Sequence, residues 1–160
     1  MFWKKKKVGS IFSICDGQII RLSEVSDPVF SEKILGDGVA IFPESQEILS
    51  PVDGKIIQVF DTKHAYSILS DDGLEILVHI GLNTVELKGE GFKSFVNNGD
   101  MVKIGQKIAE INIEYIESMG YQLYTPVLIT NLDKIDKIDA KEGKIKKGEE
   151  IIRYIKKWQS

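Results

Sequence analysis

Two segments that are typical of β-strands flank a tight turn and hold the only two histidines of the chain. Residues 62–69 contain His64 and residues 74–80 contain His79, and both segments are rich in β-branched and apolar side chains. The intervening Ser-Asp-Asp-Gly at positions 70–73 is a hairpin signal, because aspartate and glycine accept turn dihedral angles that β-branched residues refuse. A hairpin requires antiparallel strands, so it limits the fold more than any other feature.

The length of this turn decides whether the two imidazoles meet. If Asp71 and Asp72 form its centre, His64 pairs directly with His79; if Asp72 and Gly73 do, the two histidines are diagonal neighbours. Either even-length turn places both rings on one face of the sheet, about 5 to 8 Å apart. An odd, bulged loop would separate them.

Thr62 precedes His64 by two residues, so its side chain projects from the same strand face and its hydroxyl could fix a ring tautomer. Two imidazoles that contact the same bound atom are suited to two kinds of chemistry. One is zinc binding by both neutral rings with an acid or water. The other is phosphoryl transfer, in which one ring attacks phosphorus and the second donates a hydrogen bond to a phosphoryl oxygen. The spacing alone does not choose between them.

Composition limits the remaining possibilities. A chain of 160 residues with 42% hydrophobic content is expected to form a single domain with one core, over residues 11–160. The formal net charge of -3 gives no sign of a nucleic-acid partner. Cys15 is the single cysteine and has no internal disulfide partner, which fits a reducing cytoplasm.

Residues 1–10 are predicted to form a flexible tail that is basic and aromatic. Phe2 and Trp3 precede four consecutive lysines, and no long apolar segment follows that could form a signal peptide or a membrane span. Such a tail could rest weakly on an anionic membrane surface, at about 1 kcal/mol per lysine.

Short turns recur along the chain and indicate duplicated β-units. Asp16-Gly17 separates two strand-like segments within residues 11–22, and Asp53-Gly54 repeats the same device. Residues 102–108 and 145–151 match in their apolar, lysine and glycine positions. We therefore expect an all-β fold, an antiparallel sandwich or barrel with a few short helices.

One of these helices is predicted over residues 27–36 and is about two turns long. Asp27 suits its N-cap, Pro28 its first position, and Gly36 its left-handed end. A second short helix is expected between Asn112 and Gly120.

The sequence around His79 resembles a known signature. Gly-Leu-Glu-Ile-Leu-Val-His-Ile-Gly-Leu-Asn-Thr-Val at positions 73–85 is similar to the phosphohistidine signature of the glucose-family IIA component of the phosphoenolpyruvate-dependent sugar phosphotransferase system. Other segments that resemble blocks of this family, in family order, are residues 36–38, 51–54, 62–68 and 84–92. The resemblance covers residues 14–156 and implies an antiparallel sandwich of duplicated hybrid motifs.

The resemblance implies a cytoplasmic phosphotransferase component that needs no metal and no cofactor. His79 would accept a phosphoryl group from the histidine phosphocarrier protein and pass it to a cysteine of the IIB domain of a sugar permease. His64 would hold a phosphoryl oxygen, and Thr62 would orient His64. Imidazole suits this relay because it is a good nucleophile and, once phosphorylated, a good leaving group near neutral pH.

The resemblance also implies a partner-binding face beside the two histidines. Its residues would be Asp27, Val29, Phe30, Ile34, Leu35, Phe60, Leu77 and Asn83. Asn83 departs from the pattern, because the glucose branch carries an aspartate at this position. The missing charge would alter the attraction or repulsion of a partner more than the chemistry.

Other functions stay open. The same face could bind regulatory target proteins without catalysis, alongside the relay or in its place. A zinc hydrolase of the related sandwich fold would need a His-x-His pair with a further histidine and an aspartate, and this chain has two histidines in total. Zinc held by His64, His79 and an acid of a partner is a third alternative. This sequence does not identify the sugar, because the sugar is recognised by permease domains.

Overall fold

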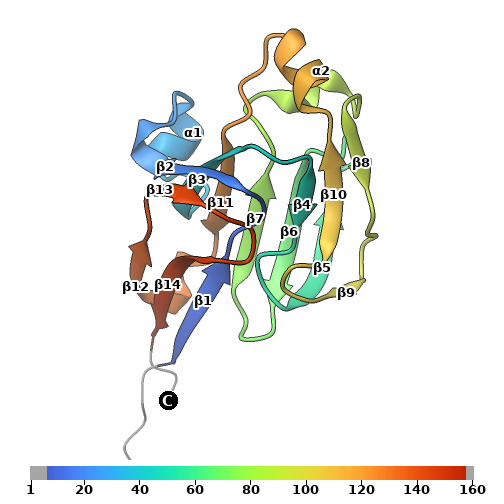
Figure 1. Ribbon diagram of the computed structural model, residues 1–160. Helices are drawn as coiled ribbons and strands as arrows, with labels where there is room; N and C mark the ends of the chain where they lie inside the picture. Colours follow the sequence, from blue (N-terminus) through green and yellow to red (C-terminus); the bar gives the residue numbers. More distant parts are fainter. Residues whose placement is uncertain (1–6, 158–160) are drawn as a thin grey trace, which may run out of the picture.

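Strands supply most of the regular structure in residues 7–157, the part of the chain that the computed structural model describes (Figure 1). The strands are β1 (Val8–Phe12), β2 (Gly17–Arg21), β3 (Asp37–Pro43), β4 (Glu47–Leu49), β5 (Gly54–Val59), β6 (Ala65–Ser70), β7 (Glu75–His79), β8 (Phe92–Ser94), β9 (Met101–Val102), β10 (Lys107–Ile111), β11 (Thr125–Ile129), β12 (Ile135–Ala140), β13 (Gly143–Ile145) and β14 (Glu150–Lys156). The helices are α1 (Pro28–Ser31), α2 (Ile113–Ser118) and the 3-10 helices η1 (Leu22–Glu24), η2 (Thr84–Leu87) and η3 (Leu132–Lys134). The all-β prediction with a few short helices is confirmed.

The strands form three antiparallel sheets around one main core. The largest has the order β13-β2-β3-β11-β7-β6-β5-β9, and the two smaller sheets have the orders β1-β14-β12 and β4-β10-β8. Apolar side chains from all three sheets, such as Ile11, Ile76 and Ile108, are 0% exposed and belong to a single cluster. The fold is therefore the expected antiparallel sandwich. No helix in residues 7–157 is long and apolar enough to cross a membrane.

Two loops repeat the same hydrogen-bond pattern and confirm the predicted duplication. In the first loop the carboxylate of Asp16 accepts a hydrogen bond from the backbone N–H of Lys147 at 2.9 Å. In the second, the carboxylate of Asp53 accepts one from the N–H of Ile104 at 2.8 Å. Backbone bonds that also match run from Ser13 to Glu149 and from Ser50 to Gln106. Each loop therefore connects an Asp-Gly turn to a lysine-containing turn distant in sequence.

The β6–β7 hairpin confirms the predicted turn, and its loop is the odd one of the alternatives considered from the sequence. Ala65 is the partner of His79, so the loop between the strands has an odd number of residues. Gly73, with φ of +92°, adopts the left-handed conformation that closes such a loop. The carboxylate of Asp72 accepts a hydrogen bond from the hydroxyl of Tyr154 on β14. This long-range contact holds the loop in a register that local turn preferences do not predict.

Helix α1 is a single turn, shorter than the two turns predicted. Asp27 caps it by accepting a hydrogen bond from a backbone N–H at 3.0 Å, and Pro28 is its first residue, both as expected. Lys33, with φ of +58°, supplies the left-handed end before Gly36 is reached. Because so short a helix is unstable alone, burial of Phe30, at 3% exposure, holds it in place.

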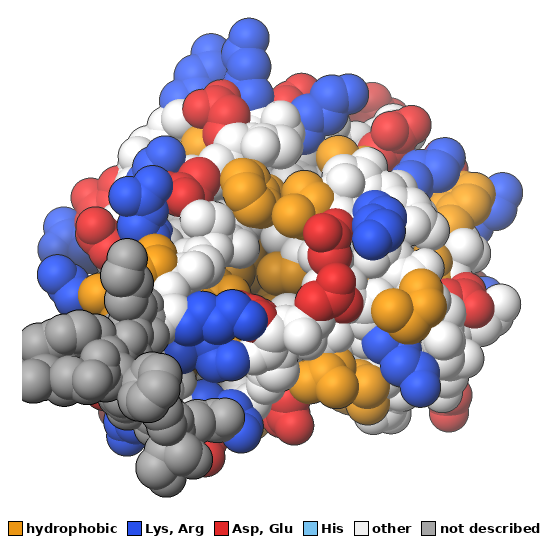
Figure 2. All heavy atoms as spheres, turned by 90° about the horizontal axis from the view of Figure 1, so that it is seen from below, with side chains coloured by type: hydrophobic (Ala, Val, Ile, Leu, Met, Phe, Trp, Pro, Cys, Tyr) orange, Lys and Arg blue, Asp and Glu red, His pale blue; other side chains and the backbone are white. Residues whose placement is uncertain are grey.

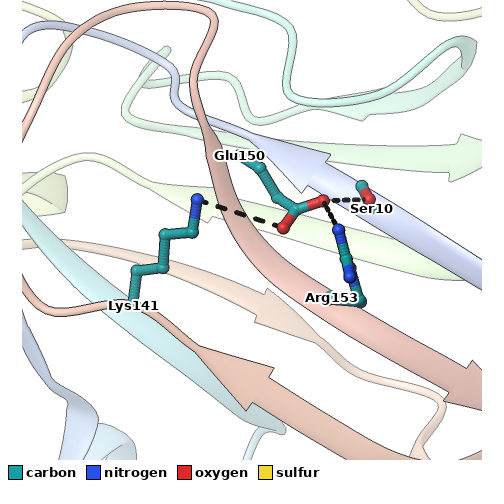
Figure 3. A network of polar contacts seen from close by, with 4 residues as sticks. All are labelled: Ser10, Lys141, Glu150 and Arg153. Atoms are coloured by element: carbon teal, nitrogen blue, oxygen red, sulfur yellow. Dashed lines mark hydrogen bonds and ion pairs between the residues drawn. The ribbon is translucent and has the colours of Figure 1, made fainter.

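The first described strand begins at Val8 and pairs with β14, so residues 8–10, which the prediction assigned to a flexible tail, belong to a strand. Glu150 on β14 accepts a hydrogen bond from Ser10 of β1 at 2.5 Å. Its carboxylate also lies 3.5 Å from Arg153 and 4.0 Å from Lys141 (Figure 3). The hydrogen bond from Ser10 and these cations lower the pKa of Glu150. The membrane-contact prediction concerns residues 1–7, nearly all of which lie outside the described residues.

Charged side chains of both signs are interspersed on the face seen from below in Figure 2. This mixture matches the small net charge of -3. Among the described residues visible in this view, no extended basic patch of the kind that binds a nucleic-acid backbone is present.

The two Asp-Gly turns give a test of the fold. A Cβ at Gly17 would lie 2.2 Å from the carbonyl oxygen of Phe42, and one at Gly54 would lie 2.1 Å from that of Leu69. We expect Gly17→Ala and Gly54→Ala each to lower the free energy of unfolding by about 2 kcal/mol or more, because backbone must move. Gly105→Ala is the control for left-handed strain, since its Cβ would meet nothing within 4 Å, and its expected cost is about 1 kcal/mol. Equal losses in urea unfolding for all three variants would contradict this account.

Candidate functional site

His79 lies at the end of β7 on the face opposite to the main core. Its neighbours Val78 and Ile80 are buried in the core, and strand alternation turns His79 and Leu77 to the other side. A second, smaller cluster covers that side and consists of Leu22, Val25, Phe30, Ala40, Leu82 and Leu128. The Phe30 ring packs on His79 with 5.0 Å between ring centroids. His79 is thus half-buried at the border of an apolar cluster.

The protonation of the His79 ring is fixed by the backbone. Its Nδ1 lies 2.8 Å from the carbonyl oxygen of Gly81, which can only accept, so Nδ1 carries the proton. Gly81 has φ of +77°, and a Cβ there would lie 2.5 Å from a methyl carbon of Thr84. Thr84 in turn donates a hydrogen bond to the carbonyl oxygen of Ile80 at 2.5 Å. In the neutral ring, Nε2 therefore carries the free lone pair.

His64 meets His79 edge to face, with 4.9 Å between ring centroids and an interplanar angle of 83°. Its Nδ1 is 2.5 Å from the hydroxyl oxygen of Thr62, so the contact that the sequence predicts between these residues is present. Phe60 packs edge-on against His64 at 5.7 Å. The side chain of His64 is 4% exposed.

The prediction that an odd loop would separate the two rings is wrong, although the loop is odd. The reason is that His64 does not belong to β6, which begins at Ala65. It is the last residue of the connection from β5, so the face of its side chain is not fixed by strand alternation. The two rings meet at the end of the sheet.

Burial keeps both imidazoles neutral near pH 7. Desolvation, and secondly the nearby His79, lower the pKa of His64 from 6.5 to about 4. Desolvation also lowers the pKa of His79, and this is opposed by its hydrogen bond to Gly81 and by the charge of Asp27. An uncharged His79 has an available nucleophilic nitrogen, and the sequence alone does not show this.

The proposed partner face is apolar and partly exposed. Val29, Ile34 and Leu35 are 37%, 64% and 43% exposed, whereas Leu77 and Phe60 are half-buried. Phe30 differs from the prediction, because at 3% exposure it offers almost no surface to a partner and instead packs on His79.

A cleft of about 590 Å³ opens beside this face and contains residues that the sequence analysis missed. Asp27 and Asn83 line it together with Glu86, Tyr121 and Gln122. The Tyr121 hydroxyl donates a hydrogen bond to Glu86 at 3.2 Å. Asn83 has φ of +59°, a left-handed conformation that asparagine adopts more readily than most residues. No spacing rule links residues 27, 83 and 121, which come together only through the fold.

Zinc requires more ligands than the histidine pair supplies. Within residues 7–157, no group of three or more His, Cys, Asp or Glu side chains lies close enough to hold a metal ion.

The buried histidines generate a pH prediction. Because the folded-state pKa of His64 is about 4, the unfolded chain takes up its proton first as the pH falls below 6.5. The contribution of His64 to the free energy of unfolding should therefore be fully present above pH 6.5 and be lost as the pH falls towards 4, by about 3 kcal/mol in total. His64→Gln should remove that part of the decline in urea unfolding measured across this range. Identical pH profiles for the two proteins would contradict the assignment.

Comparisons with known proteins agree with this geometry. The model of a family described as "phosphoenolpyruvate-dependent sugar phosphotransferase system, EIIA 1" matches residues 9–135. A Buchnera aphidicola (subsp. Acyrthosiphon pisum) protein named PTS system glucose-specific EIIA component is 44% identical over 151 residues, which cover 94% of this chain and 93% of that protein. The Haemophilus influenzae protein of the same name is 43% identical, with coverage of 92% and 89%.

A solved structure gives the same result. Glucose permease IIA from Mycoplasma capricolum superposes with a TM-score of 0.86 at 38% identity, and the match covers 95% of this chain and 99% of that one. Proteins of this kind are phosphotransferases that carry a phosphoryl group from the histidine phosphocarrier protein to the IIB domain of a sugar permease. The chain belongs to the EIIA 1 family of the phosphoenolpyruvate-dependent sugar phosphotransferase system.

Proposed function

We propose that Nε2 of His79 is the atom that carries the phosphoryl group in this relay. The observation that supports this most is the hydrogen bond from Nδ1 to the carbonyl oxygen of Gly81, which leaves Nε2 unprotonated and fixes the orientation of the ring. In the accepting step a bond forms between Nε2 and phosphorus while the phosphorus–nitrogen bond of the carrier's phosphohistidine breaks. The carrier's imidazole leaves with the electron pair of that bond.

His64 assists the transfer as a hydrogen-bond donor. If the hydroxyl of Thr62 donates to Nδ1, the proton of the neutral His64 ring lies on Nε2, where it can reach an oxygen of a phosphoryl group on His79. In the onward step a cysteine thiolate of the IIB domain attacks phosphorus, and the bond to Nε2 of His79 breaks. Charge on the phosphoryl oxygens is then stabilised by His64.

The apolar face formed by Val29, Ile34, Leu35, Phe60 and Leu77 receives both partners in turn. The exposure of large apolar side chains near the histidines supports this role, since Ile34 is 64% exposed and Leu35 is 43% exposed. The same surface would serve regulatory target proteins. Action in the cytoplasm also belongs to this proposal, and the single cysteine, Cys15, is compatible with it.

Two substitutions test the roles of the histidines. After incubation with phosphoenolpyruvate, the general phosphotransferase and the histidine phosphocarrier protein, His79→Ala should gain no phosphate, because its nucleophile is absent. His64→Gln should still gain one acid-labile phosphate but transfer it to the IIB domain about 10²-fold more slowly, since a hydrogen-bond donor to the transition state is altered. Intact-protein mass measures acceptance and quenched-flow measures transfer. A phosphate on His79→Ala would refute the assignment, as would normal transfer by His64→Gln.

The N-terminal tail has its own test. We propose that the lysines at positions 4–7, with Phe2 and Trp3, attach the protein weakly to anionic membranes, on the basis of their composition. Co-sedimentation with anionic liposomes should fall on deletion of residues 1–7 and on addition of salt, whereas neutral liposomes should show no difference. Equal co-sedimentation of the full and truncated chains would remove this proposal.

A further inference from the structure

We propose that Lys63 is a positioning residue whose left-handed backbone conformation turns the His64 ring towards His79, a role that rests on the proposed relay. Lys63 has φ of +59°, a left-handed value that is uncommon for residues other than glycine. It lies between Thr62 and His64, the two residues joined by the hydroxyl–imidazole contact.

Strand alternation alone would turn the His64 side chain to the face of the sheet opposite to His79, so the backbone must depart from it. On β6, Tyr66 and Ile68 are 0% exposed and belong to the main core. A regular extension of the strand would give His64 the same face as these residues. His79 lies on the other face, because its neighbour Val78 is in the core and pairs with Tyr66. Since β7 keeps its alternation through His79, the departure lies on the His64 side.

The hydrogen bonds locate that departure at Lys63. The N–H of Lys63 donates to the carbonyl oxygen of Phe60 at 2.7 Å, and Phe60 donates to Ala65 at 3.0 Å, so the chain reverses between them. The carbonyl oxygen of His64 still accepts a hydrogen bond from Ile80 at 2.7 Å. The backbone of His64 is therefore attached to the sheet while its side chain is free of the strand's alternation. The left-handed residue immediately before it accounts for this change of direction.

Because the proposed role belongs to the backbone, it predicts a pattern among substitutions. Lys63→Gly and Lys63→Asn accept the left-handed conformation, whereas Lys63→Val strongly disfavours it. The control Gly105→Val places the same side chain at another left-handed position, with φ of +84° and nothing within 4 Å of the Cβ, in the loop between β9 and β10. It separates the local effect on His64 from strain in general.

Histidine NMR titration of the unphosphorylated proteins is the first measurement. His64 should titrate at about pH 4 in the native chain and in the Gly, Asn and control variants, because burial is unchanged. In Lys63→Val its midpoint should move towards the ordinary value of about 6.5. An unchanged midpoint in Lys63→Val would overturn the proposal. This readout stands even if the native chain proves unable to carry phosphate.

Phosphoryl transfer to the IIB domain at saturating partner is the second measurement. Lys63→Val should still accept phosphate but transfer it about 10²-fold more slowly, as expected for a misplaced His64. The Gly, Asn and control variants should transfer normally. Slow transfer by Lys63→Gly and Lys63→Asn would show that the ammonium group matters and would overturn the backbone role. Equal slowing by Gly105→Val would overturn it as well.

Discussion

The hydrogen bond from Nδ1 of His79 to the carbonyl oxygen of Gly81 is the interaction on which the site depends. It fixes the tautomer and orients the ring, and both are required if Nε2 is to be a nucleophile. That carbonyl is held by a backbone with little freedom, because Gly81 is left-handed and any side chain there would collide with Thr84. The end of β7 is therefore built around one acceptor, and the chemistry of His79 follows from backbone geometry.

Desolvation sets the second constraint, because the burial that keeps the imidazoles uncharged also makes a new charge expensive. His64 is 4% exposed, and desolvation is the main cause of its pKa of about 4. A phosphoryl group on His79 would bring negative charge to this environment, where the centroid of the His64 ring lies 4.9 Å from that of His79. A neutral donor stabilises that charge without forming a permanent ion pair. In the proposed relay, the phosphoryl group would therefore be bound weakly enough to be passed on.

Local signals in the sequence predict elements, whereas the site depends on contacts that they do not contain. The Asp27 cap and the hairpin turn are readable because their residues act on immediate neighbours. The register of the hairpin is not, since Asp72 is bound by Tyr154 from β14. Lys33 and Lys63 adopt left-handed conformations that lysine rarely favours, so neither the short α1 nor the rotated His64 could be predicted from propensity.

Duplication places equivalent connections of the two units beside the site. The Asp-Gly turns that open β2 and β5 align β3 with β6, and in that alignment the positions of His64 and His79 correspond to Asp37 and Leu128. One unit therefore carries both histidines, and its counterpart carries none. The connection between β2 and β3 in the counterpart contains α1, and its Phe30 ring reaches His79 at 5.0 Å. The equivalent connection between β5 and β6 places His64 at 4.9 Å from the same ring. The two equivalent connections thus flank His79, one with the ring of Phe30 and one with the ring of His64, and this difference makes the site asymmetric within a duplicated scaffold.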